Sequence, residues 1–338
     1  MPIFSHDLAI DLGTSNLLIY VKEKGIVINE PSVVAVRKNE SKTNDIIAFG
    51  TEAKKMIGKT PENIEIIRPI RDGVIADFEI TEIMLRHFIQ KVCHRRFFVR
   101  PRIIIAVPIG ITPVEKKAIF ECAKSAGASE VYLIEEPMAA AIGAGLPITE
   151  PKGNMVVDIG GGTLEIAVIS LGGIVYNRSV RVAGDKMDES IVQSINRNYK
   201  FSIGLNMAEM IKNHLGNALP DNDINTMEVR GRDLVSGIPR SISIRSNEIT
   251  KIISEQVNTI VQTVIIALEQ MPPELSGDIL EKGIALTGGV SLLKNLDILL
   301  KQKTKVPIIV SEKPFFNVAM GAGKALENVS ILKEIVID

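Results

Sequence analysis

Apolar residues recur at every second position in two stretches of the chain, residues 17–21 and 164–168. A period of two is typical of a β-strand that buries one face. Before each stretch, a short apolar run ends at an aspartate, Asp11 or Asp158. A turn of small residues then connects the aspartate to the stretch. The pattern therefore predicts a strand, a tight turn and a second strand twice, with the two copies 147 positions apart.

The correspondence continues in the strands that follow. Residues 25–27 match residues 173–175, and residues 32–33 match residues 179–180. One half of the chain therefore resembles a copy of the other, which predicts two similar lobes.

Helical and strand patterns alternate between the two copies. The predicted elements are a helix at 80–92, a strand at 103–107, a helix at 113–126, a strand at 131–134 and a helix at 137–144. Such an alternation is typical of an α/β fold in which the strands pair in parallel.

Two segments interrupt the repeat. The first, about residues 33–70, is expected to hold a short helix at 51–58. The second, about residues 184–245, is expected to hold helices at 188–199 and 207–215 and strands at 227–229 and 241–244. The longest helix is predicted to run from residue 246 or 247 to the prolines at 272 and 273, which stop it. We assign residues 1–147 to lobe I, residues 148–317 to lobe II and residues 318–338 to a C-terminal helix that returns to lobe I.

Length and composition fit this organisation. A chain of 338 residues, 46% hydrophobic and 23% charged, is long enough for two globular units with ample cores. Its 39 basic and 40 acidic residues leave a net charge of -1, so we expect no nucleic-acid partner. Two cysteines without metal spacing, no basic leader and no long apolar run lead us to expect a cytoplasmic protein that is neither exported nor membrane-spanning.

The two aspartate turns are suited to binding phosphate. A turn of small residues lets backbone N–H groups approach an anion closely. A third phrase, residues 284–291, also runs from a strand into paired glycines, and a helix predicted at 292–300 would offer its N-terminus to a phosphate or ribose oxygen. Each phrase has a simpler reading, since aspartate before glycine is common in turns and a glycine pair often only reverses the chain.

Together these phrases resemble the two phosphate motifs and the adenosine motif of the superfamily of ATPases that includes actin, heat-shock chaperones and sugar kinases. Within that superfamily, residues 29–35, 71–77, 134–143, 230–233 and 272–275 closely resemble the MreB/Mbl family of bacterial actins. The resemblance covers nearly the whole chain, in order.

The resemblance implies a duplicated actin-like (ribonuclease H-like) α/β fold of two lobes, each with a small inserted subdomain, and a nucleotide in the cleft. It implies ATP or ADP with Mg as ligands and slow ATP hydrolysis coupled to assembly. It also implies a homopolymer of paired protofilaments on the anionic inner face of the cytoplasmic membrane, with cell-wall elongation proteins as partners in setting rod shape.

The resemblance also implies the roles of individual residues. Asp11 and Asp158 would lie near magnesium, through its waters, because this ion is content with one or two carboxylates. Glu136 would hold the attacking water, with Thr163 as a second hydrogen-bonding group and Asp158 beside them. The phosphates would be bound by Gly13, Thr14, Ser15 and Asn16 and by Gly160, Gly161, Gly162 and Thr163. The segment that contacts the ribose would be Glu209, Met210, Ile211 and Lys212. The adenosine would be bound by Gly288, Gly289, Val290, Ser291 and Leu292.

Other readings of these residues stay open at this point. Glu136 could instead favour a helix N-terminus, and Glu209 with Lys212 could be an ordinary surface pair. Val290 stands where the family usually has a third glycine. Since valine resists positive φ, we expect either a different backbone conformation there or an adenine pocket with a closer wall. A small-molecule kinase and a chaperone-type ATPase of the same superfamily are the alternative functions, but we find no acceptor pocket and no substrate domain.

Residues 94–102 form the one cluster that is both basic and aromatic. In the family the corresponding loop contacts the membrane, and Phe97 and Phe98 between arginines suit an anionic lipid surface. The alternative is that both rings pack inward against the following strand. Near the N-terminus the apolar residues are only Ile3 and Phe4, so we expect membrane binding to sum weak contacts along a polymer.

Overall fold

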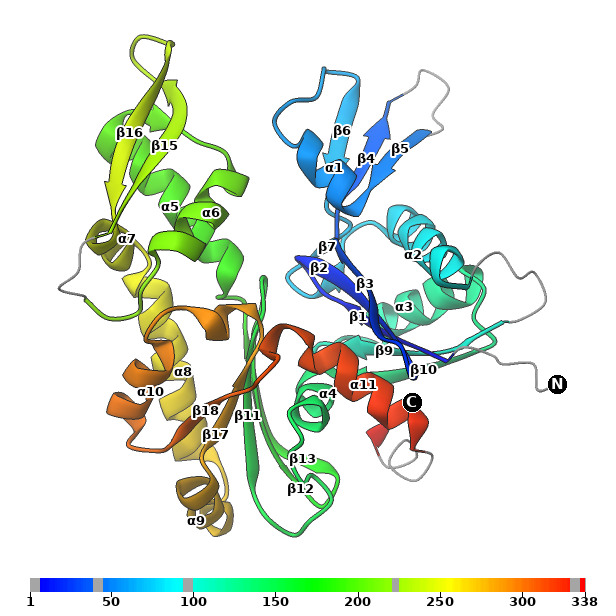
Figure 1. Ribbon diagram of the computed structural model, residues 1–338. Coiled ribbons are helices and arrows are strands. Elements are labelled where there is room, and N and C mark those ends of the chain that lie inside the picture. The colour runs from blue at the N-terminus through cyan, green and yellow to red at the C-terminus, as the bar shows by residue number, and fades with distance from the viewer. Residues whose placement is uncertain (1–6, 39–44, 94–99, 221–224, 329–334, 338) are drawn as a thin grey trace.

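The computed structural model describes residues 7–38, 45–93, 100–220, 225–328 and 335–337 (Figure 1). Its framework is a pair of five-stranded sheets with the same internal order. We call the part built around the first sheet lobe I and the part built around the second sheet lobe II.

The two sheets are equivalent strand by strand. Sheet I has the order β10-β9-β1-β2-β3, and sheet II has the order β18-β17-β11-β12-β13. In each, the central strand pairs antiparallel with the strand after its turn and parallel with a later strand. The strands of sheet I are β1 (Leu8–Leu12), β2 (Asn16–Val21), β3 (Gly25–Pro31), β9 (Arg102–Val107) and β10 (Glu130–Glu135). Those of sheet II are β11 (Asn154–Ile159), β12 (Leu164–Ser170), β13 (Gly173–Val180), β17 (Ile284–Thr287) and β18 (Ile308–Val310). The predicted duplication and the predicted parallel pairing are confirmed.

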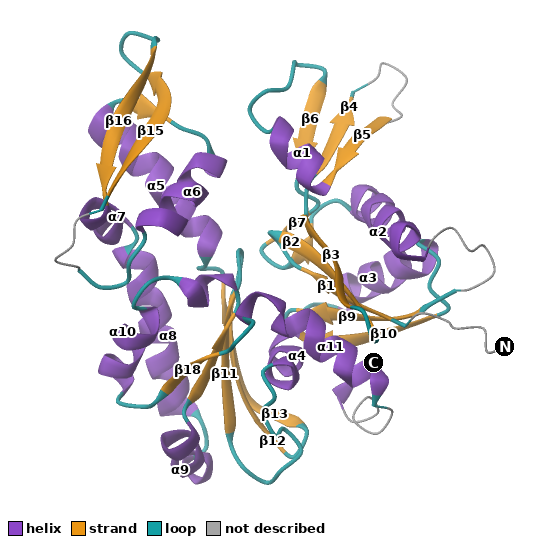
Figure 2. Ribbon diagram, in the orientation of Figure 1, coloured by secondary structure: helices purple, strands orange, loops and turns teal. Residues whose placement is uncertain are grey.

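Helices cover the outer face of each sheet (Figure 2). Residues of α2 (Phe78–Cys93) and α3 (Pro113–Ser125) share one buried core with sheet I. Residues of α8 (Ser254–Gln270) and α10 (Leu296–Thr304) share another core with sheet II, and α9 (Pro273–Lys282) adds Ile279 to it. None of the helices in the described ranges is both long and apolar enough to cross a membrane.

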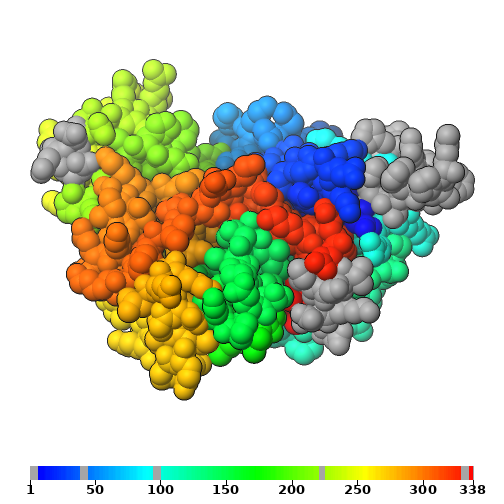
Figure 3. All heavy atoms as spheres, turned by 60° about the horizontal axis from the view of Figure 1, so that its bottom comes forward, coloured from blue at the N-terminus to red at the C-terminus, as the bar shows by residue number. Residues whose placement is uncertain are grey.

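Two helices form an interlobe layer between the sheets, α4 (Glu136–Gly143) and α11 (Asn317–Glu327). They pack very closely, because a Cβ atom on Gly321 would lie 1.7 Å from the Ala139 carbonyl oxygen and one on Gly143 would lie 2.0 Å from that of Asn317. In the space-filling view α11 (red) lies against the first strands of the chain (blue) and near loops of lobe II (green) (Figure 3). The interlobe layer therefore connects the lobes through tightly packed backbone.

A small subdomain rises from each lobe. Small subdomain I consists of β4 (Val34–Arg37), β5 (Asp45–Phe49), α1 (Gly50–Met56) and β6 (Ile64–Ile67). Small subdomain II consists of α5 (Gly184–Tyr199), β14 (Phe201–Ser202), α6 (Leu205–Leu215), β15 (Thr226–Asp233) and β16 (Pro239–Arg245). Both lie within the ranges expected for the insertions, and the exact lobe boundaries remain a prediction.

Three expectations about elements were wrong. The helix expected at 292–300 is instead a single 3₁₀ turn, Gly289–Leu292, and α10 begins only at Leu296, after Asn295 in the left-handed region. The long helix is interrupted at Ile253, where ψ is 0°, so that α7 (Ser246–Ile252) and α8 are separate. The C-terminal helix ends at Glu327, well before residue 338.

The remaining short elements connect these parts. They are the two-stranded sheet of β7 (Ile70–Arg71) and β8 (Val74–Ile75) and a 3₁₀ turn over Pro314–Phe316. Gly73, between β7 and β8, has a φ of 78°, which suits glycine in so tight a turn.

Candidate functional site

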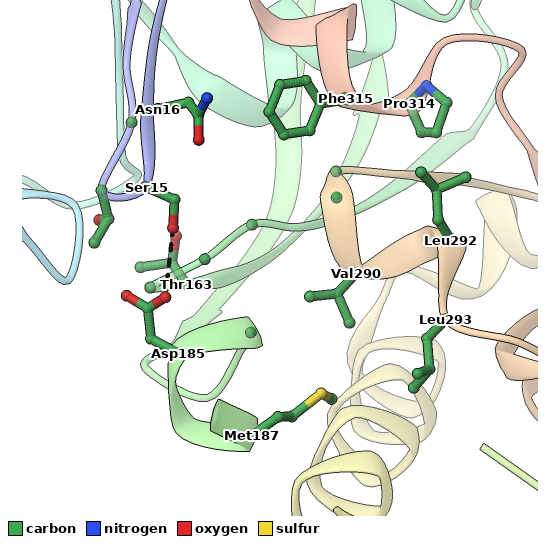
Figure 4. A pocket seen from close by; sticks show the side chains of 18 of the residues that line it. Ser15, Asn16, Thr163, Asp185, Met187, Val290, Leu292, Leu293, Pro314 and Phe315 are labelled. Atoms are coloured by element: carbon green, nitrogen blue, oxygen red, sulfur yellow. Dashed lines mark hydrogen bonds between the residues drawn. The ribbon is translucent and has the colours of Figure 1, made fainter. Parts of the chain in front are cut away.

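A cavity of about 590 Å³ lies between the lobes, directly above the interlobe layer. This volume is in the usual range for a small-molecule site. Its walls come from both lobes. Figure 4 shows Ser15, Asn16, Thr163 and Asp185 on one side, and Val290, Leu292, Leu293 and Pro314 on the other. One end of the cavity is therefore polar and the other is largely apolar.

Turn I, residues 11–16, forms the lobe I wall of the polar end, and its side chains are held in place. The Thr14 hydroxyl accepts a hydrogen bond from the Gly73 N–H at 2.9 Å, and the Asn16 amide donates to the Asn29 amide oxygen at 2.8 Å. Asp11, Gly13, Thr14, Ser15 and Asn16 all line the cavity, as the sequence led us to expect of a site.

Turn II, residues 158–163, faces turn I from lobe II. The Gly160 N–H donates to the Thr163 carbonyl oxygen at 2.9 Å, and the Asp185 N–H at the start of α5 donates to the Gly161 carbonyl oxygen at 2.8 Å. A Cβ atom on Gly161 would lie only 1.9 Å from the Ser15 hydroxyl oxygen. The absence of a side chain at this position is therefore what lets the two turns approach each other.

The period of two along the strands places both aspartates on the same interlobe face. Met155, Val157 and Ile159 pack in the lobe II core, whereas Val156 packs in the interlobe core, so Asp158 also points toward lobe I. The same alternation in β1 sends Asp11 toward lobe II. Burial and the charge of Asp158 raise the pKa of Asp11 to about 7, and burial raises the pKa of Asp158 to about 7.

Glu136 begins α4 directly after β10 and lines the cavity floor. Burial raises the pKa of its carboxyl group well above the usual value, and the charges of Glu165, Asp11 and Asp158 add to this effect. Thr163 lines the cavity opposite, and its hydroxyl makes no hydrogen bond to any residue that the structure describes. Both groups are therefore available to a ligand or a water molecule.

Glu165 is a residue that the sequence analysis missed. It is 1% exposed, and its Oε1 atom accepts hydrogen bonds from the Ile109 N–H of lobe I at 3.1 Å and from the Ser179 hydroxyl at 3.2 Å. Its Oε2 atom is buried and has no hydrogen-bond partner within the described part of the chain. Burial, together with the charge of Asp158, raises the pKa of Glu165 to about 8. The strand pattern could have indicated Glu165, because a tight turn between β11 and β12 pairs it directly with Asp158 and puts both side chains on one face of the sheet.

The residues present fit a magnesium ion held together with phosphate oxygens. Among the described residues, no group of three or more His, Cys, Asp and Glu side chains is arranged to hold a metal by itself. Magnesium seldom needs such a group, because it keeps several waters and binds one or two carboxylates beside phosphates. Burial raises the pKa values of Asp11 and Asp158, and the charge of Asp158 adds to the shift of Asp11. A cation beside the two carboxyl groups would favour their ionised forms.

Side chains of α6 line the middle of the cavity. Glu209 and Lys212 both reach it, one helical turn apart. The Lys212 ammonium is bound within lobe II, to Asp188 at 2.9 Å and to the Gly184 carbonyl oxygen at 3.0 Å. Met210 and Ile211, expected at the same place, do not line it: Met210 is exposed on the surface and Ile211 is buried in the lobe II core. Helical geometry turns these two positions away from the face that carries Glu209.

The apolar end is built from two 3₁₀ turns. Gly288, Gly289, Val290 and Leu292 line it, but Ser291 does not, because it is buried and its hydroxyl donates to the Gly288 carbonyl oxygen at 2.6 Å. Val290 lies within the 3₁₀ turn without a positive φ, and it lines the wall of the cavity. The helix N-terminus expected after Gly289 is absent from this wall.

The cavity is completed by residues that the sequence analysis did not single out. Pro314 and Phe315 come from the second 3₁₀ turn, and Met187 and Leu293 lie across from them (Figure 4). In the sequence, this wall is marked only by a proline followed by two phenylalanines. That Phe315 lies beside Gly289 is a tertiary contact, which the local sequence does not indicate. Phe97 and Phe98, expected to contact a membrane, lie outside the described residues.

Comparison with solved structures defines the class of protein. The fold superposes on a crystal structure of MreB5 of Spiroplasma citri bound to ADP with a TM-score of 0.90, at 37% sequence identity over 99% of both chains. It also matches the chain of a MamK double helical filament with a TM-score of 0.78, over 96% of this chain and 99% of that one, at 20% identity, which speaks for the fold alone. The molecule is thus a two-lobe protein of the actin-like class.

Sequence comparison identifies the family within this class. The model of the family described as MreB/Mbl protein matches residues 5–334. The cell shape-determining protein MreB of Escherichia coli strain K12 is 55% identical over 332 residues, which are 97% of this chain and 95% of that protein. The chain therefore belongs to the MreB/Mbl family, as the resemblance indicated.

Proposed function

We propose that the protein is an ATP-binding bacterial actin that assembles into filaments and takes part in determining cell shape. The observation that carries the proposal is the pair of opposed turns, each with a buried aspartate, at the polar end of a cleft of nucleotide size. Relatives support it, since the E. coli relative is named for cell shape and the S. citri relative was crystallised with ADP.

Turn I and turn II would bind the phosphates through backbone N–H groups, with the Thr14 and Ser15 hydroxyls of turn I beside them. Asp11 and Asp158 would hold magnesium through its waters, and the ion would neutralise phosphate charge. Glu209 and Lys212 would contact the ribose, while Gly288, Gly289, Val290 and Leu292 with Phe315 would enclose the base. A nucleotide held in this way contacts both lobes at once, so its binding fixes the angle between them.

Glu136 and Thr163 would position water for slow hydrolysis of ATP. Both line the polar end from opposite lobes, and the hydroxyl of Thr163 has no partner within the described part of the chain. Positioning accounts for most of the catalysis in phosphoryl transfer. A site completed by two lobes hydrolyses only when the cleft is closed, which would couple hydrolysis to assembly.

The proposal extends to paired protofilaments on the inner face of the cytoplasmic membrane, together with cell-wall elongation proteins. Phe97 and Phe98 are the candidates for lipid contact. Flotation with anionic vesicles in the presence of ATP tests this part. We expect the wild-type protein to float and the Phe97→Ala, Phe98→Ala double variant to remain largely at the bottom.

High-speed sedimentation combined with phosphate release tests assembly and hydrolysis together. With Mg-ATP we expect the protein to pellet and to release phosphate slowly. Glu136→Ala should still pellet but hydrolyse about a hundredfold more slowly, in the range seen for loss of one positioning group. Glu135→Ala is the matched control, because Glu135 precedes Glu136 but does not line the cavity. A protein that stays soluble and transfers phosphate rapidly to a sugar would contradict the proposal.

A further inference from the structure

An ion pair between Lys54 and Glu209 joins the two small subdomains across the cleft. The ammonium of Lys54, in the last turn of α1, lies 2.6 Å from the Oε2 atom of Glu209 on α6. The Asn206 side-chain amide of α6 also donates to the Lys54 carbonyl oxygen, at 3.5 Å. In Figure 1 the two helices face each other from opposite lobes. Lys54 is thus the point at which small subdomain I touches a residue that lines the nucleotide cavity.

Other contacts close the cleft lower down. Asp185, at the start of α5, accepts a hydrogen bond from the Ser15 hydroxyl at 3.4 Å and lies 3.8 Å from the Arg68 guanidinium. These contacts lie beside turn I and turn II, at the phosphate end of the cavity. Lys54 and Glu209 line the same small recess as Ser15, Arg68 and Asp185. Glu209 also lines the nucleotide cavity together with Lys212, where the proposed function places the sugar.

Glu209 differs from its neighbour Lys212 in what holds it. Lys212 is paired inside lobe II with Asp188, and both side chains are largely buried. Glu209 has Lys54 of lobe I as its ionic partner, and its side chain is 40% exposed. Of the two α6 residues proposed to contact the ribose, only Glu209 depends on the other lobe for its orientation.

The ion pair matters through geometry rather than through its own strength. An exposed pair contributes little to folding stability. A carboxylate, however, accepts several hydrogen bonds, and here only one oxygen is taken by Lys54. The ammonium therefore fixes the side chain, while Oε1 has no hydrogen-bond partner among the residues that the structure describes. A fixed acceptor binds a hydroxyl with a smaller loss of entropy than a mobile one.

We propose that Lys54 determines sugar specificity as a positioning residue. It holds Glu209 so that its free oxygen accepts a hydrogen bond from a ribose hydroxyl, and ribonucleotides are thereby preferred to deoxyribonucleotides. The same contact ties recognition of the sugar to closure of the small subdomains. This inference rests on the proposed function, namely that the cavity binds an adenine nucleotide.

Calorimetric titration of the full chain with ADP, 2′-deoxy-ADP and 3′-deoxy-ADP, each with magnesium, tests the inference. In the wild type we expect ADP to bind about tenfold more tightly than at least one deoxy form, as for a hydrogen bond to a charged acceptor. Lys54→Met should reduce this ratio to about threefold or less, and Lys54→Arg should restore most of it. Glu209→Gln should also reduce it, because a neutral amide is a weaker acceptor.

Lys55→Met is the matched control. Lys55 is the next residue of the same helix and is paired with Glu52 within that helix, at 2.7 Å, so its loss should leave the ratio unchanged. An unchanged ratio in Lys54→Met would overturn the inference. A raised ratio would do so too, because it would mean that Lys54 competes with the sugar.

The wild-type titrations separate this inference from the proposed function. If the wild type binds ADP and both deoxy forms equally, the inference fails while nucleotide binding stands. If the wild type binds none of them, the proposed function itself fails. Lys54→Gln serves as a second variant should Lys54→Met prove unstable, and it is expected to lower the ratio in the same way.

Discussion

Turn I and turn II occupy equivalent places in two equivalent sheets, yet they carry different side chains. Turn I presents Thr14, Ser15 and Asn16, each hydrogen-bonded to a neighbouring segment. Turn II presents three glycines, and Cβ atoms on Gly161 and Gly162 would lie 1.9 Å and 2.8 Å from hydroxyl oxygens of turn I. The duplicated turns are therefore complementary rather than identical. Turn I supplies hydroxyl and amide side chains, and the glycines of turn II leave room for them.

The strongest way to break this complementarity is Gly161→Ala. The new methyl group would collide with Ser15, and overpacking of about 1–3 kcal/mol should weaken ATP binding by about tenfold to a hundredfold in calorimetry. Gly160→Ala is the matched control, because its Cβ atom would come no nearer than 3.6 Å to the Thr163 carbonyl oxygen. Adding Ser15→Gly to Gly161→Ala should recover part of the affinity. Equal losses in the two alanine variants would refute the comparison.

Each turn carries one buried aspartate, Asp11 in turn I and Asp158 in turn II, and this pair predicts a dependence on pH. An aspartate has a pKa of 3.8 when unperturbed, whereas burial raises those of Asp11 and Asp158 to about 7, and the charge of Asp158 adds to the shift of Asp11. The folded state thus binds protons more tightly than the unfolded chain. This contribution to the free energy of unfolding is fully present below pH 3.8 and is lost as the pH rises through 7.

Without nucleotide or magnesium, the protein should therefore melt at a lower temperature at pH 8 than at pH 6. Asp158→Asn should raise the melting temperature at pH 8 by about 2–4 °C in calorimetric scans, while weakening binding of Mg-ADP. Binding of Mg-ADP to the wild type should tighten from pH 6 to pH 8, because the ion needs the ionised pair. A variant that melts lower than the wild type at pH 8 would show that the repulsion is not there.

Replacing Thr14 should affect stability, whereas replacing Thr163 should affect hydrolysis. Thr14→Val removes the acceptor of the Gly73 N–H and should lower the free energy of unfolding by about 1 kcal/mol in urea titrations. Thr163→Val removes a hydroxyl that has no partner in the described parts of the protein, so it should leave stability nearly unchanged and slow phosphate release instead. A loss of stability in both variants would remove the distinction between a structural and a functional hydroxyl.

Val290→Gly should have the smallest effect. Valine fits the 3₁₀ turn, so glycine would add only flexibility there, with a cost of about 0.5–1 kcal/mol. Affinity for ADP should fall by about fivefold at most. A gain of affinity would instead indicate that the valine side chain crowds the base.

Local patterns allowed much of the fold and of the polar end of the site to be predicted. The period of two in the strands and the turns after Asp11 and Asp158 are properties of single segments, and they predicted the central strands of both sheets with their turns. The short edge strand β18 was not predicted. The apolar end was predicted less well. The helix expected after Gly289 is displaced by a 3₁₀ turn and by the left-handed Asn295, which no periodicity indicates.

Contacts between distant segments account for the rest. Phe315 reaches the cavity only because its 3₁₀ turn packs beside Gly289. Lys54 and Glu209 are 155 positions apart and meet only because two insertions face each other across the cleft. Glu165 is the exception, since its pairing with Asp158 was implicit in the strand pattern. Its cross-lobe hydrogen bond to Ile109 was not.

Amide hydrogen exchange with and without Mg-ADP tests most directly whether one nucleotide joins the two turns. We predict that peptides covering residues 11–16 and residues 158–163 gain protection together at the same ligand concentration, and that Gly161→Ala weakens the gain in both. Protection of one turn without the other, or of neither, would contradict the account.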